Sequence, residues 1–228
     1  GGRMLLHELG QLVDQGGAFG HALRRALGIR QWDVLGHSYG GLIAMLGTRR
    51  DLGGVRRLVT VDAVGPTSAW MPALHAAALD RSTEEDRATL ERLYASLADP
   101  DVDPAVHGAY RRASYGAWFA DPELGAYFRP PEAASLTGAS VAAHLRREGY
   151  DRREQPRALS TPTLVIHGER DALPAAVAHE LTRLLPRAHQ ILLPHAGHMP
   201  FWEAPERFFT VVGDFLAAPA TGPPRPSR

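Results

Sequence analysis

Short apolar runs alternate with helically spaced apolar residues along most of the chain. Continuous apolar character predicts strands at 32–35, 58–61, 163–166 and 190–193, as expected for strands buried on both faces of a parallel sheet. Apolar residues three or four positions apart predict helices around these strands, at 5–13, 19–27, 40–49, 174–185 and from 205 onward. Because strands alternate with helices, the sequence predicts an α/β fold, with a mostly parallel sheet of about four strands flanked by helices.

The connection between the second and third predicted strands breaks this alternation. It is roughly a hundred residues long, whereas a crossover between parallel strands needs a dozen or so. Ser82 and Glu85 have the spacing of a capping box ahead of a helical pattern, and 141–147 is also spaced as a helix. We therefore expect an inserted helical cap. The expected division is a cap at 65–151, a core at 1–64 and 152–217, and a disordered Pro-rich tail at 218–228.

Aromatic residues gather in the middle of this insertion. Packing between short helices explains such a cluster, and a wall that faces a substrate is the alternative. The residues are Tyr110, Tyr115, Trp118, Phe119, Tyr127 and Phe128.

The composition limits the kinds of molecule that the chain is expected to bind. The chain has 25 basic and 25 acidic residues with no long run of one sign, so we expect no nucleic-acid or membrane partner. A small-molecule or short-peptide substrate fits this balance better. The absence of cysteine excludes disulfides, thiolate metal sites and cysteine nucleophiles. No apolar stretch approaches the roughly 20 residues of a membrane span, and the first residues lack a secretory pattern, so the expected location is cytoplasmic.

The segment GHSYG places Ser38 between Gly36 and Gly40, directly after a predicted strand and before a predicted helix. A serine exposed on a sharp strand-to-helix turn needs small flanking residues, because larger side chains would collide there. The pattern therefore predicts that Ser38 is a nucleophile. A tight structural turn is the alternative.

A serine nucleophile requires a base and an acid to orient that base. His195 and His198 follow the fourth predicted strand, and Glu169 and Asp171 follow the third. Because the carboxyl ends of parallel strands meet at one edge of a sheet, these side chains are expected near Ser38. Asp62, at the end of the second strand, is a weaker candidate for the acid, with capping of the strand end as its alternative role. His37 and His167 adjoin motif glycines and are expected to be packing or hydrogen-bonding residues.

The histidines do not suggest a metal site. No acidic or cysteine ligand of matching spacing accompanies His195 and His198, and His179-Glu180 lacks the second histidine of a zinc-protease helix. We expect no metal and no cofactor.

Three segments together carry a family resemblance: LRRALGIRQWDVLGHSYGG, HGERDALP and AGHMPFWEAPERF. From about residue 23 to 216 the chain resembles serine hydrolases of the α/β-hydrolase fold, and these segments are similar to those of the proline iminopeptidase branch. The resemblance implies Ser38 as nucleophile, Asp171 as acid, His198 as base and the backbone N–H of Tyr39 as one oxyanion donor. His195 remains the alternative base and Asp62 the alternative acid.

The resemblance also implies a reaction. It implies cleavage of a peptide-like or ester bond through an acyl-enzyme, with removal of an N-terminal proline as one candidate activity. Esterases and carbon–carbon bond hydrolases of this fold share the triad. The iminopeptidase branch recognises a free amino terminus through acidic cap residues, for which the candidates here are Glu84, Glu85, Asp86, Glu91, Asp121 and Glu123.

The chain departs from the resembled family upstream of Ser38. Members of the fold carry further strands there, together with a His-Gly-rich loop that supplies a second oxyanion donor; here Gly16-Gly17 is at most a remnant. We therefore expect a partial fold in which the strand at 32–35 is an uncovered edge, open to self-association. A truncated chain, a fragment completed by another chain and a non-catalytic fragment that only binds a ligand or partner are the three explanations.

Overall fold

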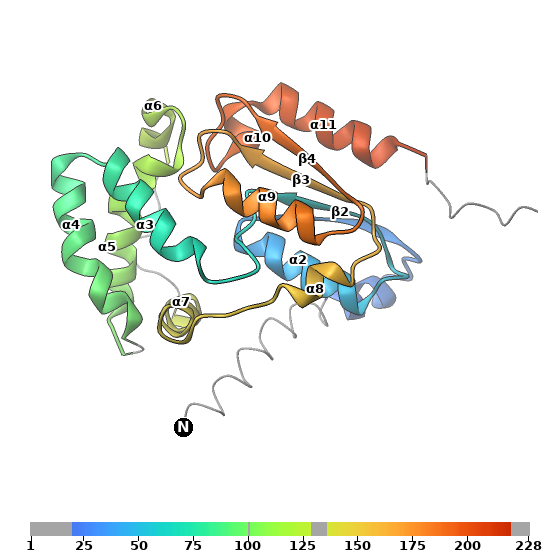
Figure 1. Ribbon diagram of the computed structural model, residues 1–228, viewed down its shortest axis with the longest axis horizontal. Coiled ribbons are helices and arrows are strands. Elements are labelled where there is room, and N and C mark those ends of the chain that lie inside the picture. The colour runs from blue at the N-terminus through green and yellow to red at the C-terminus, as the bar shows by residue number, and fades with distance from the viewer. Residues whose placement is uncertain (1–19, 100, 129–135, 220–228) are drawn as a thin grey trace, which may run out of the picture.

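A parallel α/β layer and a group of helices beside it make up the computed structural model, which describes residues 20–99, 101–128 and 136–219 (Figure 1). The helix predicted at 5–13 lies outside the described residues, and residues 20–26 of the helix predicted at 19–27 are helical. Most of the tail predicted to be disordered, from 220 onward, also lies outside them.

The sheet has the four predicted strands, each slightly longer than the apolar run that predicted it. They are β1 (Trp32–His37), β2 (Val55–Val61), β3 (Thr163–Gly168) and β4 (Ala188–Leu193). All pair in parallel, in the order β1-β2-β3-β4. The predicted fold class is therefore confirmed.

Helices cover both faces of this sheet (Figure 1). They are α2 (Tyr39–Arg50), α8 (Glu154–Arg157), α9 (Ala175–Leu184), α10 (Pro200–Glu203) and α11 (Pro205–Ala217). On one face, Leu58 and Val165 pack with residues of α2 and α9. On the other face, Val59 and Leu164 pack with Phe208 of α11. Because successive strand residues point to opposite faces and helices cover both, β3 is buried at every position and β2 at every position except Arg56.

Strand β1 is an edge of the sheet in the part of the chain that the structure describes. It pairs with β2 on one side, and its Leu35 side chain is 49% exposed. The expectation of an uncovered strand before Ser38 is therefore confirmed within the described residues.

The connection between β2 and β3 is the helical insertion, defined here as α3 to α7. Its elements are α3 (Trp70–Arg81), α4 (Glu84–Tyr94), η1 (Ala95–Ala98), α5 (Pro104–Tyr115), η2 (Gly116–Trp118), α6 (Pro122–Ala126) and α7 (Leu136–Glu148). Small buried residues allow these helices to approach closely, with Leu90 at the centre among Ala78, Ala113 and Ala117.

The predicted capping box is wrong by one residue. Thr83, and not Ser82, caps α4, and its hydroxyl accepts the backbone N–H of Asp86. Ser82 instead donates its hydroxyl to the carbonyl of Ala78 at the end of α3. Because both residues have a hydroxyl and an acid three positions later, the spacing alone did not separate them.

Among the helices of the described ranges, none combines the length and the apolar composition needed to cross a membrane.

Candidate active site

Ser38 lies on a sharp turn between β1 and α2. Its backbone has φ 55° and ψ −123°, a left-handed conformation that costs free energy for any residue other than glycine. A Cβ on Gly36 would lie 2.3 Å from the carbonyl oxygen of Gly40, so residue 36 must be glycine for the turn to close. The turn therefore has the strained geometry that the GHSYG motif predicts.

The second glycine that this turn requires is Gly41. A Cβ on Gly40 would meet no described atom within 4 Å, whereas a Cβ on Gly41 would lie 2.5 Å from Cβ of Ala63. The expectation that Gly40 is needed for space is therefore wrong, and close packing of α2 against the end of β2 explains the neighbouring glycine instead.

The structure brings Ser38, His198 and Asp171 together. His198 Nε2 lies 2.9 Å from Ser38 Oγ, and His198 Nδ1 lies 2.8 Å from Asp171 Oδ2. The three residues come from the ends of β1, β4 and β3 respectively, at the same edge of the sheet. In this geometry Nδ1–H donates to the carboxylate and Nε2 is free to accept the serine proton.

His195, the alternative base, is not at this site. It is exposed on a turn at φ 62°, and the hydrogen bond to Ser38 comes from His198. Glu169, the other acidic candidate after β3, is also exposed.

The backbone of His198 is held on both sides. Its N–H donates to the carbonyl of Trp118 in the helical insertion over 2.7 Å, and its carbonyl accepts from His37 Nε2 over 2.8 Å. The Trp118 ring also contacts the imidazole edge-on, with 4.3 Å between the ring centroids. His37 is therefore a supporting residue, and the insertion helps to fix the imidazole.

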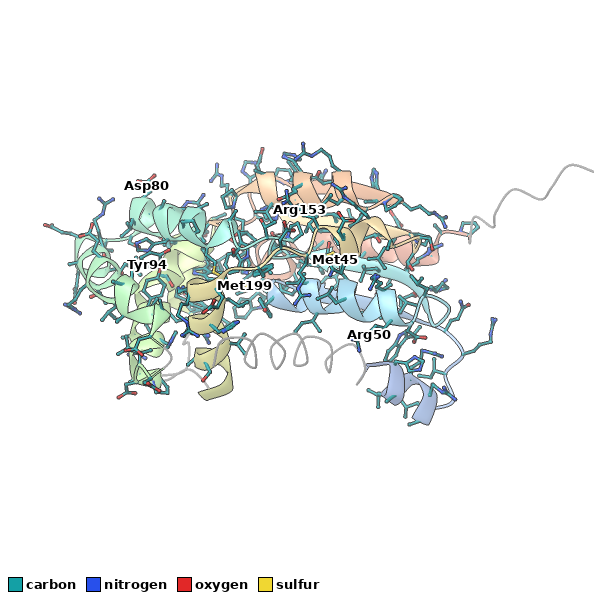
Figure 2. All side chains as sticks on the ribbon, turned by 60° about the horizontal axis from the view of Figure 1, so that its bottom comes forward. Met45, Arg50, Asp80, Tyr94, Arg153 and Met199 are labelled. Carbon is teal, nitrogen blue, oxygen red and sulfur yellow. The ribbon has the colours of Figure 1, made fainter. Side chains whose placement is uncertain are left out.

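Glu203 of α10 joins the histidine loop to the insertion. One of its carboxylate oxygens accepts the N–H of Ala120 over 2.6 Å, and the other accepts the N–H groups of Gly197 and Met199 over 2.8 and 3.3 Å. Figure 2 shows Met199 where the insertion meets the α/β layer. Nothing in the sequence indicated this role, because it depends on a contact between segments distant in the chain.

Arg81 of α3 makes a second such connection. Its guanidinium donates to the carbonyls of Arg170, Asp171 and Ala117, at 2.7, 3.2 and 3.3 Å. The loop that carries Asp171 is therefore anchored to the insertion, and sequence reasoning missed this contact too.

Asp62 is buried beside the triad but does not contact His198 by a hydrogen bond. It has φ 44°, is fully buried, and accepts the backbone N–H of Gly168 over 2.7 Å. Burial raises its pKa well above the usual range, and the charge of Asp171 raises it further. Burial therefore favours the neutral form of Asp62, in contrast to the alternative in which its carboxylate orients the base.

Burial also dominates the pKa values of the other two acidic and basic members of the site. It lowers the pKa of His198 to about 4, while the charge of Glu203 acts in the opposite direction, and so keeps the imidazole neutral. A neutral imidazole is the form that can accept a proton from serine. Burial raises the pKa of Asp171, while the N–H of Leu173, which donates to its Oδ1 over 2.9 Å, lowers it.

Asp62, His167 and Asp171 form a buried cluster whose donor atoms lie within 4.8 Å of one another. Several of these atoms already have partners, since His167 Nε2 donates to the carbonyl of Leu173 over 2.8 Å and both acids accept backbone N–H groups. His167 Nδ1 and Asp62 Oδ2 are buried without a hydrogen-bond partner among the described residues. A neutral Asp62 is also a poor ligand for a cation. The donor set therefore suits a hydrogen-bonded support for the triad better than a metal site.

Tyr39, the expected oxyanion donor, is the residue at which α2 begins. As the first residue of α2 its N–H has no carbonyl acceptor within the helix, and it directly follows Ser38. The positive end of the helix dipole lies at the same place. Gly16-Gly17, the remnant of the upstream loop from which a second donor was expected, lies outside the described residues.

The chain has relatives among characterised hydrolases. It is 33% identical over 121 residues to the pimeloyl-[acyl-carrier protein] methyl ester esterase of Nitrosomonas europaea, covering 52% of this chain and 45% of that protein. It is 30% identical over 200 residues to the 2-hydroxymuconate semialdehyde hydrolase of Pseudomonas putida, covering 84% and 64%. The crystal structure of a proline iminopeptidase from Mycobacterium smegmatis superposes with a TM-score of 0.61 at 22% identity, over 90% of this chain and 69% of that one.

These comparisons agree with the fold described above. The chain spans less than two thirds of the length of the two curated relatives, and the solved iminopeptidase shows likeness of fold alone. The Alpha/beta hydrolase family matches residues 6–211, which include the strands, the insertion and all three residues of the hydrogen-bonded chain. The chain belongs to the alpha/beta hydrolase family.

Proposed function

We propose that this protein is a serine hydrolase that cleaves an ester or peptide-like bond through an acyl-enzyme. The observation that carries the proposal is the continuous hydrogen-bonded chain from Ser38 Oγ through His198 to Asp171, with links of 2.9 and 2.8 Å. A serine hydroxyl is unreactive at neutral pH without such a base, and an oriented neutral imidazole supplies it.

Acyl transfer would proceed in two halves. Ser38 Oγ attacks the carbonyl carbon while its proton passes to His198 Nε2, and the N–H of Tyr39 donates to the developing oxyanion. His198 then protonates the leaving group, whose bond to the acyl carbon breaks. Water, deprotonated by His198, attacks the acyl-serine, and its hydrolysis releases the acid and restores the hydroxyl. Asp171 stabilises the imidazolium in both halves.

Among the candidate substrates we place esters first, ahead of peptides with an N-terminal proline. An aminopeptidase needs carboxylates that face the substrate's ammonium group. The insertion's acidic candidates are mostly solvent-exposed, and none lines its cavity: Glu84, Glu85, Asp86, Glu91, Asp121 and Glu123. The named esterase among the relatives also supports this order.

Initial rates with p-nitrophenyl butyrate and with proline p-nitroanilide test the proposal. We expect the ester to be turned over faster than the anilide, and Ser38→Ala to abolish both activities. Ser96→Ala is a matched control, because Ser96 lies in the insertion and only donates to the carbonyl of Leu93. Unchanged turnover by folded Ser38→Ala would refute the role of Ser38. A folded chain that hydrolyses neither substrate would favour the alternative, a fragment that only binds a ligand or partner.

A further inference from the structure

The helical insertion contains a cavity of about 170 Å³. Its walls come from α3, α5 and α7, which lie together on one side of the molecule (Figure 1). Trp118 forms part of the wall, and the same ring contacts the imidazole of His198 at 4.3 Å. Trp118 is therefore the side chain that connects the cavity wall to the imidazole of His198.

Three of the residues that line this cavity carry a buried side-chain nitrogen without a hydrogen-bond partner in the described part of the chain. His107 Nε2, Arg146 Nε and Trp118 Nε1 are buried and form no hydrogen bond within the described residues. His107 as a whole is only 8% exposed. Buried donors are normally satisfied, and leaving one unpaired is costly. Three such residues around one cavity favour a polar occupant that accepts hydrogen bonds.

The charge of the lining favours an anion. Arg111 and Arg146 line the cavity, and no aspartate or glutamate is among its described lining residues. After burial, the charge of Arg146 is the largest influence that lowers the pKa of both His75 and His107. Glu91, which acts in the opposite direction on His75, is exposed on α4 and outside the lining. A cationic group would meet two arginines here, whereas a carboxylate would be paired.

Aromatic rings hold the guanidinium of Arg146 in place. Its central carbon lies 5.9 Å from the ring centroids of both Tyr94 and Tyr110. His75 stacks on Tyr94 with 3.6 Å between centroids, and its Nδ1 bonds the Tyr110 hydroxyl over 2.8 Å. Figure 2 shows Tyr94 among the helices of the insertion. A planar guanidinium held in one orientation suits a planar carboxylate, which it can bind through two parallel hydrogen bonds.

The volume limits what can bind. A protein cavity of about 150 Å³ holds a ligand the size of benzene, so this one has room for about six non-hydrogen atoms. A carboxylate with three methylene groups has this size. The remaining carbons of the acyl chain would run beside Trp118 toward the serine.

We propose that this cavity is a subsite for the terminal carboxylate of the acyl group, with Arg146 and His107 as its principal contacts. The substrates would then be half-esters of short dicarboxylic acids. This inference rests on the proposed hydrolase function for its meaning, but the binding itself can be measured without catalysis.

Calorimetric titration of the Ser38→Ala chain measures binding at the subsite separately from catalysis. The ligands are monomethyl adipate, neutral dimethyl adipate and cationic methyl 6-aminohexanoate, which share a six-carbon acyl chain. We expect the half-ester to bind at least about tenfold more tightly than the other two, as a charge-assisted hydrogen bond allows. Equal binding of all three, or tighter binding of the amine, would overturn the proposal, and neither result depends on a variant that folds poorly.

Arg146→Met locates the subsite in the same Ser38→Ala background. We expect it to weaken binding of the half-ester by about 10- to 100-fold. Arg147→Met is the matched control, because Arg147, the next residue on α7, is exposed and pairs with Glu148. Equal weakening by both variants would refute a role for Arg146. Half-ester binding without any serine reactivity would retain the subsite and remove the hydrolase function. Hydrolysis of neutral esters without a preference for the carboxylate would retain the hydrolase function and remove the subsite.

Discussion

Replacing Asp62 and Asp171 in turn by asparagine decides which of these two buried acids orients the base, His198. In Asp171→Asn the amide oxygen must accept the N–H of Leu173, as Asp171 Oδ1 does at 2.9 Å. The amide NH₂ then faces His198 Nδ1, which has to become the acceptor. That tautomer places the imidazole proton on Nε2, directed at Ser38 Oγ, 2.9 Å away, where it can no longer accept the serine proton. The opposite amide orientation would set two donors against each other at Leu173.

Asp62→Asn is expected to change kcat little, because an amide can replace a neutral carboxyl group. One oxygen of Asp62 accepts from Gly168 over 2.7 Å, and in the neutral form that burial favours the second oxygen carries the proton. An amide reproduces both functions in the same volume. The loss of a correctly oriented base costs about 10⁴-fold in kcat, about 5.5 kcal/mol, so we expect that loss in Asp171→Asn and less than about tenfold in Asp62→Asn.

The assay is steady-state hydrolysis of p-nitrophenyl butyrate, with thermal unfolding of both variants as the check on folding. The reverse ranking, with Asp62→Asn reduced by about 10³-fold or more and Asp171→Asn active, would refute the assignment of Asp171 as the acid. Equal large losses in two folded variants would show that the carboxyls share their charge and that Asp62 is not neutral.

Three further predictions concern the base, the turn and the insertion. Because burial lowers the pKa of His198 to about 4, kcat/KM should stay constant as the pH falls from 7 to about 5 and decline only as the imidazole is protonated; an acid limb near 6.5 would contradict this. Gly36→Ala should unfold the turn or abolish activity, whereas Gly40→Ala should keep the melting temperature, and the opposite order would refute the steric argument. Thr83→Ala should lower the free energy of unfolding by about 1 kcal/mol in urea titration, and no change would remove Thr83 as the helix cap.

The sequence predicted the sheet well because its strands are buried on both faces. The run at 163–166 has no polar alternation and lies within β3, which is buried at every position. Parallel strands also bring their carboxyl ends to one edge, so a serine, an acid and a histidine after three different strands were expected to converge. Ser38, Asp171 and His198 do so.

The hydrogen bonds that hold the His198 loop in place could not be predicted, because they join residues that are far apart in the sequence. Ala120 and Glu203 are 83 positions apart, and His37 reaches a carbonyl 161 positions away. No local spacing specifies such pairs. The distinction between Gly40 and Gly41 is of the same kind, since it depends on how closely α2 packs against Ala63.

The protonation of Asp62 was also beyond sequence reasoning. Its position after β2 made it a candidate acid, but its charge depends on complete burial and on the nearby carboxylate of Asp171. Likewise, the aromatic residues of the insertion were expected either to pack or to face a substrate. Tyr110 and Trp118 line the cavity, whereas Phe119 is buried.

The activation of Ser38 can be measured directly by reacting the chain with a fluorophosphonate and locating the adduct by peptide mass spectrometry. We expect one adduct, on Ser38, that is lost in His198→Ala although the hydroxyl remains. A folded chain that stays unlabelled, or that is labelled equally with and without His198, would contradict the central claim that the imidazole activates this serine.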